Sequence, residues 1–212
     1  MKTKGIIFDL DGVIVSTDEY HYQAWKKLAD KEGIYFDRII NNRLRGVSRM
    51  ESLEIILERA TKNYSDEEKL SMATEKNENY RNSLYELTPD SVDPETIEAL
   101  NQIKNLGLKV AIASSSKNTK LILDRIGLIN FFDAIADGND ITHSKPHPEV
   151  FLTAASRLSL NPEDCIIVED AFAGIDAGIA GNFRNCGIGD AYKYEKTMYP
   201  ITSLKDILKY ID

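Results

Sequence analysis

Cysteine is scarce in this chain, and targeting features are missing. Its 212 residues include two cysteines, Cys165 and Cys186, too few for a disulfide framework. Both fall in or near segments expected to be buried strands, so we expect reduced thiols in a cytoplasmic protein. Lys2 and Lys4 are followed by only four apolar residues, which argues against a signal peptide. No apolar run approaches the length needed to span a membrane.

An excess of positive charge is also missing. The formal net charge is −8, from 26 basic and 34 acidic residues, and no cluster of Lys and Arg stands out. We therefore expect no nucleic-acid partner. Hydrophobic residues make up 42% of the chain, which is enough for a core. The length allows one large domain, or a core domain with a smaller companion.

The most informative motif is an apolar segment that stops on two acids and a glycine. Residues 6–8 predict a short buried strand, and Gly12 predicts the turn that ends it. Asp9 and Asp11 are two residues apart, so on an extended backbone both carboxylates leave the same face. Such a pair suits a nucleophile beside a proton-transfer group, with a divalent cation shielding both. A strand that simply ends in an acidic turn is an equally good explanation of this motif alone.

Two regions of the chain differ in their patterns. Residues 17–87 are helical throughout, with one expected helix over 20–32 and capping boxes at Ser48–Glu51 and Ser65–Glu68. After residue 88, helices and strands alternate. Strands are expected at 109–113, 134–136, 165–168 and 185–188, and helices at 94–106, 118–126, 149–158, 171–180 and from 203 on. This pattern predicts an α/β fold with a Rossmann-like parallel-sheet core, residues 1–16 and 88–212, and an inserted α-helical cap, residues 17–87.

Chemically versatile residues follow the expected strands. Ligands bind at the carboxyl ends of strands in open α/β sheets, so these residues should meet at one edge. Ser114–Asn118 has the composition of a phosphate site at a helix start, Lys145 precedes a proline, and Glu169-Asp170 suits magnesium. Each also has a structural explanation: a capped helix start, a surface lysine, and acids that favour a helix dipole. Their joint occurrence after successive strands favours a catalytic site.

The ordered set Asp9-Leu10-Asp11-Gly12, Ser114, Lys145-Pro146 and Glu169-Asp170 resembles the haloacid dehalogenase superfamily. The resemblance covers essentially the whole chain. It implies phosphoryl transfer through an aspartyl-phosphate on Asp9, with Asp11 as general acid/base and Ser114 and Lys145 around the transferring group. It also implies a magnesium ion held by Asp9, the Asp11 backbone carbonyl and Asp170, with Glu169 close by.

Within that superfamily, the chain is most similar to the β-phosphoglucomutase branch. The resemblance rests on motifs that include Glu19-Tyr20-His21, Ala24-Trp25, Gly46-Val47-Ser48-Arg49 and Lys76-Asn77. It implies interconversion of β-glucose 1-phosphate and glucose 6-phosphate, with β-glucose 1,6-bisphosphate as intermediate and activator. It implies substrate binding by these residues: His21, Trp25, Gly46, Val47, Ser48, Arg49, Ser52, Lys76, Ser116, Lys117 and Asn118. From spacing alone, Trp25 fits a core role as well as a pocket role, and the charged residues fit a solvated helix surface.

Two other functions remain open at this stage. The same core could serve a magnesium-dependent sugar-phosphate phosphatase, which would release inorganic phosphate. A phosphosugar-binding protein without turnover is the more remote alternative, since both acids of the first motif are present. For all three functions we expect a small phosphosugar ligand, no membrane partner and a monomer.

Overall fold

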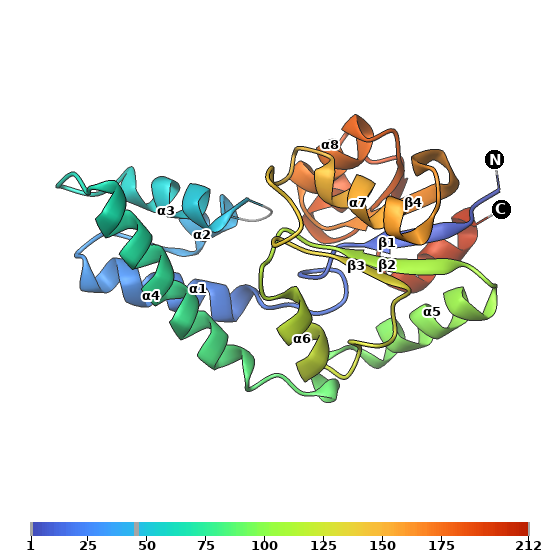
Figure 1. The fold of residues 1–212 in the computed structure, drawn as a ribbon, viewed down its shortest axis with the longest axis horizontal. Helices are drawn as coiled ribbons and strands as arrows, with labels where there is room; N and C mark the ends of the chain where they lie inside the picture. Colours follow the sequence, from blue (N-terminus) through green and yellow to red (C-terminus); the bar gives the residue numbers. More distant parts are fainter. Residues whose placement is uncertain (1, 45–46, 212) are drawn as a thin grey trace. The chain divides into compact units, whose positions relative to one another are not determined.

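The computed structural model describes residues 2–44 and 47–211 (Figure 1). The chain divides into two compact units: Met1–Ser16 with Leu87–Asp212, called here the sheet unit, and Thr17–Glu86, called the helical unit. Leu87 therefore groups with the sheet unit, whereas the sequence pattern placed it with the helices. No helix among the described residues is long and apolar enough to cross a membrane.

The sheet unit is built on a six-stranded parallel sheet of order β3-β2-β1-β4-β5-β6. The strands are β1 (Gly5–Phe8), β2 (Lys109–Ala113), β3 (Ala134–Ala136), β4 (Cys165–Glu169), β5 (Arg184–Gly187) and β6 (Tyr199–Pro200). The helices are α5 (Pro94–Asn105), α6 (Thr119–Arg125), α7 (Glu149–Leu158) and α8 (Phe172–Ala180), with 3-10 turns at Pro89–Ser91, Pro162–Asp164, Gly189–Lys193 and Leu204–Tyr210. The central strands are buried on both sides because helices cover both faces of the sheet (Figure 1).

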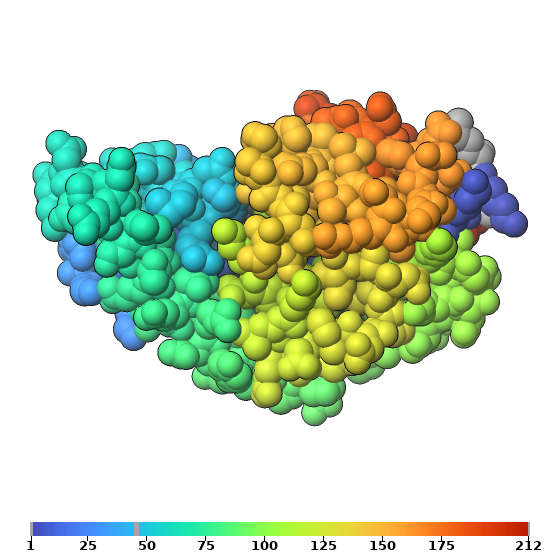
Figure 2. Space-filling view, viewed as in Figure 1, coloured from blue at the N-terminus to red at the C-terminus, as the bar shows by residue number. Residues whose placement is uncertain are grey.

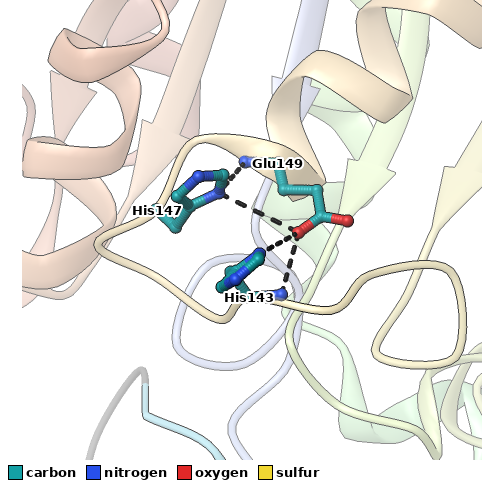
Figure 3. Close-up of side chains that lie close together, drawn as sticks. All are labelled: His143, His147 and Glu149. Carbon is teal, nitrogen blue, oxygen red and sulfur yellow. Dashed lines mark hydrogen bonds and ion pairs between the residues drawn. The ribbon is translucent and has the colours of Figure 1, made fainter.

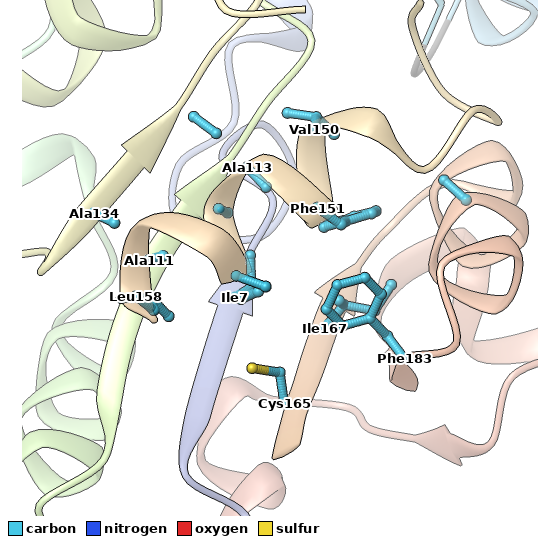
Figure 4. Close-up of a cluster of buried hydrophobic side chains, with 14 residues drawn as sticks. Ile7, Ala111, Ala113, Ala134, Val150, Phe151, Leu158, Cys165, Ile167 and Phe183 are labelled. Atoms are coloured by element: carbon cyan, nitrogen blue, oxygen red, sulfur yellow. The ribbon is translucent and has the colours of Figure 1, made fainter. Parts of the chain in front are cut away.

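One face of the sheet packs against α7 and α8. In Figure 4, Phe151 of α7 lies over the strands near Ile7 and Ile167, and Phe183 contacts its ring with centroids 6.0 Å apart. Cys165 belongs to this cluster, and both cysteines are buried free thiols, as expected. This packed layer gives the loops at the carboxyl ends of the strands a rigid base.

The helical unit contains α1 (Asp18–Lys31), α2 (Arg38–Asn42), α3 (Arg49–Leu57) and α4 (Asp66–Leu84). Both predicted capping boxes are confirmed: the Ser48 and Ser65 side chains accept from the N–H groups of Glu51 and Glu68. Trp25, Leu28, Leu53, Ile56 and Ala73 are among the buried residues of its core.

Some short elements differ from the predicted ones. Helix α2 and strand β6 were not expected, because five and two residues are too few to show a hydrophobic period. The expected C-terminal helix from residue 203 is a 3-10 helix over Leu204–Tyr210. Helix α1 begins at Asp18, two residues before the expected start.

Candidate active site

Strand β1 places Asp9 at the carboxyl edge of the sheet. The strand is buried at all four positions, and the N–H of Asp9 donates to the Val168 carbonyl at 2.9 Å. The chain then turns back, with the N–H groups of Ile14 and Val15 both donating to the Leu10 carbonyl. The Asp9 side chain is only 10% exposed. Its carboxylate is therefore held on rigid backbone in a largely dry environment.

Lys145 lies between two of the predicted carboxylates. Its Nζ donates to Asp9 Oδ1 at 2.5 Å, to Glu169 Oε1, and to the carbonyl of Ala113 at 3.2 Å. An ammonium group has three donors, so these acceptors match its full capacity. The side chains of Lys145 and Glu169 are almost completely buried. The backbone carbonyl of Ala113 was not expected from the sequence, because any residue could supply it.

Charge and burial act together in this cluster. Burial on its own lowers the pKa of Lys145, but the charges and hydrogen bonds of Asp9 and Glu169 outweigh it, and the pKa is raised. Burial raises the pKa of Glu169 to about 7; the Asp9 charge adds to this, and Lys145 opposes it. Because one ammonium faces two carboxylates, the cluster favours a further cation.

Asp170 adds a third carboxylate next to this pair. Asp9, Glu169 and Asp170 each offer an oxygen, and these atoms lie within 4.8 Å of one another. Glu169 Oε2 also accepts from the N–H groups of Asp170 and Ala171, at 3.1 and 3.2 Å. Two glycines leave room for these carboxylates, because any larger residue there would collide with them. A Cβ on Gly12, where φ is +83°, would lie 2.2 Å from Asp170 Oδ2. A Cβ on Gly174 would lie 1.9 Å from Glu169 Cδ.

The loop after β2 carries the predicted phosphate-binding residues. The N–H of Ser116 donates to Ser114 Oγ at 3.2 Å, and the N–H of Asn118 donates to Ser116 Oγ at 3.2 Å. Ser114 and Asn118 are buried, whereas Lys117 is exposed. These hydroxyls shape the loop by accepting local backbone bonds. The same loop contains Ser115, whose buried Oγ has no hydrogen-bond partner among the described residues.

The helical unit brings together His21, Trp25 and Lys76, three predicted substrate residues. Lys76 Nζ lies 2.8 Å from His21 Nδ1, and 4.6 and 4.7 Å from the ring centroids of Trp25 and Tyr80. The ammonium group has only donors, so His21 Nδ1 accepts in this bond and the ring is neutral. Burial, followed by the charges of Lys76 and Arg49, lowers the pKa of His21 well below 6.5.

Tyr80 belongs to this group, although its sequence position indicated only an apolar helix face. Its ring stacks on His21 with centroids 3.9 Å apart, and its hydroxyl lies 2.9 Å from Thr17 Oγ1. Tyr80 follows Lys76 by four residues, so both side chains lie on one face of α4. This i, i+4 spacing is the feature of the sequence that could have indicated a contact between Tyr80 and Lys76.

The remaining predicted residues of the helical unit lie on or before α3. Ser48 is the N-cap of α3, Arg49 is its first residue and half-buried, and Ser52 is buried one turn later. Burial, followed by the neighbouring Arg81 charge, lowers the pKa of Arg49. Val47 is half-buried, and Gly46 lies outside the described residues. Trp25 is 2% exposed and packs in the core of this unit, which is one of the two roles considered for it, and its ring faces Lys76.

Comparison with known proteins places the chain in a family. A model of the haloacid dehalogenase-like hydrolases matches residues 3–182, most of the chain. The chain belongs to this family. It is 44% identical over 188 residues to β-phosphoglucomutase of Bacillus subtilis (strain 168), covering 88% of this chain and 83% of the relative. It is 31% identical over 180 residues to fructose-1-phosphate phosphatase YqaB of Escherichia coli (strain K12), covering 83% and 91%.

A solved structure agrees with this placement. β-Phosphoglucomutase from Clostridium difficile superposes with a TM-score of 0.92 at 42% identity, covering 99% of this chain and 95% of that one. The predicted haloacid dehalogenase-like fold, with a parallel sheet and additional helices, is therefore confirmed.

Haloacid dehalogenase-like proteins of this kind carry out metal-dependent phosphoryl transfer, and the residues present fit a metal. Asp9, Glu169 and Asp170 form an all-oxygen donor set with net negative charge, which suits a hard divalent cation. Asp11 is not part of this side-chain group. It is partly exposed, and its backbone forms an isolated β-bridge with Val15 in the turn.

Proposed function

We propose that the protein is a β-phosphoglucomutase, which interconverts β-D-glucose 1-phosphate and β-D-glucose 6-phosphate. The observation that carries this proposal is the 44% identity to the B. subtilis β-phosphoglucomutase over most of both chains. The buried cluster of Asp9, Lys145 and Glu169 supports it, because phosphoryl transfer needs alignment and charge neutralisation in a dry site.

In the first half-reaction, the aspartyl-phosphate on Asp9 is the phosphoryl donor. The 6-hydroxyl oxygen of β-glucose 1-phosphate attacks phosphorus, the bond from phosphorus to Asp9 breaks, and Asp11 accepts the hydroxyl proton. The product is β-glucose 1,6-bisphosphate. Lys145 neutralises charge on the oxygens of the transferring group, and the Ser114 hydroxyl orients them by donating a hydrogen bond. A magnesium ion held by Asp9, Asp170 and the Asp11 carbonyl, with Glu169 beside it, would add positive charge there.

In the second half-reaction, the bisphosphate presents its other phosphate to Asp9. The Asp9 carboxylate attacks the phosphorus of the C1 phosphate, and the bond from this phosphorus to the C1 oxygen breaks. Asp11 returns its proton to the departing C1 oxygen, and glucose 6-phosphate leaves. Asp9 is phosphorylated again, so each cycle conserves the phosphoryl group. Added β-glucose 1,6-bisphosphate activates the enzyme because it phosphorylates Asp9 at the start.

We assign the other predicted residues to substrate recognition. Arg49 contacts the phosphate that is not transferred, because guanidinium binds phosphate oxygens bidentately. Ser116, Lys117 and Asn118, in the loop after β2, are likewise assigned to phosphate binding. His21, Trp25, Lys76 and Ser52, with residues 46–48, bind the sugar, and the buried Lys76 ammonium supplies donors to its hydroxyl groups.

A coupled assay tests this proposal against hydrolysis. The protein is given β-glucose 1-phosphate, magnesium and a trace of β-glucose 1,6-bisphosphate, while glucose 6-phosphate and inorganic phosphate are followed together. We expect glucose 6-phosphate to form from the β-anomer and not from the α-anomer, with little release of free phosphate. Release of free phosphate without isomerisation would replace the mutase with a sugar-phosphate phosphatase, the activity named for the E. coli relative.

A further inference from the structure

Three potential metal ligands gather on the segment that carries Lys145, apart from the carboxylate cluster. His143, His147 and Glu149 each offer a ligand atom, and these atoms lie within 4.8 Å of one another. Figure 3 shows both imidazole rings beside the Glu149 carboxylate. His143 Nδ1 lies 3.2 Å from Glu149 Oε2, and His147 Nδ1 lies 3.9 Å from the same oxygen. Nitrogen and oxygen ligands of one tetrahedral zinc ion lie about 3.3 Å apart, so small rotations suffice.

The Glu149 carboxylate is already oriented by backbone donors. The N–H of Thr142 donates to Oε1 at 3.0 Å, and the N–H of His143 donates to Oε2 at 2.8 Å. Glu149 is also the first residue of α7, which is anchored on the sheet through Val150 and Phe151. A ligand that is fixed in advance loses little conformational freedom when a cation binds.

The two histidines stand on either side of Lys145 and share one surface. Their ring centroids are 4.7 Å apart with an interplanar angle of 37°. The side chains of His143 and His147 are 65% and 51% exposed, and the gold segment that contains them lies on the face shown in Figure 2. His147 Nδ1 accepts a long hydrogen bond, 3.3 Å, from the N–H of Glu149, so this nitrogen carries no proton and a cation that binds it replaces that bond. A cation can therefore reach the group directly from solvent.

We propose that His143, His147 and Glu149 form a second metal site, which binds a zinc-type divalent transition-metal cation. Two imidazoles and one carboxylate suit Zn²⁺, Ni²⁺ or Cu²⁺, whereas Mg²⁺ selects oxygen ligands. The bound cation joins residues 143, 147 and 149 and so restrains the backbone on both sides of Lys145. Because it binds the folded arrangement, it stabilises the protein by mass action.

Zinc titration of the intact, tag-free protein tests the proposal. Calorimetry is run with Mg²⁺ in large excess, which competes for the carboxylate cluster around Asp9. We expect one equivalent of Zn²⁺ to bind and to raise the melting temperature. Replacement of an outer partner of a metal ligand weakens binding by about 10–100-fold, so loss of a direct ligand in His143→Gln or His147→Gln should weaken it at least about tenfold.

The matched control is His21→Gln, because His21 is the only other histidine in the chain. It should bind Zn²⁺ like the wild type. The double variant His143→Gln/His147→Gln should lose both the binding and the zinc-dependent rise in melting temperature. No binding by the wild type, or equal binding by the double variant, would overturn the proposal.

Discussion

Lys145 Nζ lies 2.5 Å from Asp9 Oδ1, although the two residues are 136 positions apart in the sequence. The same ammonium group contacts Glu169, so one positive charge holds two buried carboxylates together. Such a cluster is costly to desolvate and persists only because its members satisfy one another.

Asp9→Asn should abolish phosphoryl transfer, because the amide keeps the size of the carboxylate but is not a nucleophile. We expect a loss of at least about 10³-fold in mutase turnover. Labelled β-glucose 1,6-bisphosphate should also leave no base-labile acyl phosphate on the variant. Asp90→Asn, an exposed acid of the sheet unit, is the matched control. Mutase activity near the wild-type level in Asp9→Asn would contradict the aspartyl-phosphate mechanism.

Lys145→Met should destabilise the folded protein, because it leaves two carboxylates buried side by side. Breaking a buried ion pair costs about 3–5 kcal/mol, measurable as the free energy of unfolding in urea. Added magnesium should recover part of this loss, since a cation then shares the carboxylates. Lys196→Met removes an exposed ion pair with Asp176 and should change stability little. Equal effects of the two substitutions would argue against a structural role for the buried cluster.

Arg49→Ala should impair the mutase far more than the hydrolysis of a small phosphate ester. Loss of a charged hydrogen bond costs about 1.5–3 kcal/mol, which corresponds to about a 10–100-fold fall in kcat/KM for β-glucose 1-phosphate. p-Nitrophenyl phosphate has no second phosphate, so its hydrolysis should be nearly unchanged. Arg43→Ala, which removes an exposed partner of Glu58, serves as the control. Parallel losses with both substrates would exclude a contact between Arg49 and the phosphate that is not transferred.

Gly174→Ala should displace the Glu169 carboxylate, because its Cβ would lie within 2.3 Å of both carboxylate oxygens. Misplacement of a site group by about 1 Å can cost about 100-fold in rate, so we expect a fall of that order in kcat. Gly178→Ala in the same helix would meet only the Ile167 side chain, at 2.2 Å from Cδ1 and 3.0 Å from Cγ1. It should lower the melting temperature while largely preserving kcat. The reverse ranking of the two variants in kcat would show that Glu169 tolerates displacement.

His21 should make stability depend on pH. Its pKa is lowered by burial and nearby positive charge, so the folded state keeps the ring neutral where the unfolded chain binds a proton. Stability is therefore complete above the unfolded pKa of 6.5 and decreases as the pH falls below it, by up to about 1.4 kcal/mol per pH unit.

Urea unfolding of the wild type and His21→Gln between pH 7.5 and pH 5 measures this dependence, whose limiting slope for one proton is about 1.4 kcal/mol per pH unit. The variant should show a shallower loss of stability on acidification. His143→Gln removes a histidine from the surface and controls for the substitution itself. Identical slopes for the wild type and His21→Gln would mean that folding does not lower the pKa of His21.

Much of the local structure was predictable because it depends on short-range interactions. The capping boxes at Ser48 and Ser65 are recognisable, since an N-cap and its N3 partner bond within one turn. The strand at Lys109–Ala113 and the helix at Glu149–Leu158 have the predicted bounds, because each bears a continuous apolar run or an apolar stripe. Helix α2 and strand β6 are too short to carry such a signal.

The sequence by itself determined which residue types follow each strand, and therefore that acids, hydroxyls and a lysine gather at one sheet edge. Only the tertiary structure decided how they pair: that Lys145 contacts both Asp9 and Glu169, that Tyr80 stacks on His21, and that Gly174 makes room for Glu169. The physical reason is distance along the chain. Spacing and periodicity report on neighbours within a turn or a strand, whereas these contacts arise when packing of distant segments excludes water and sets the final geometry.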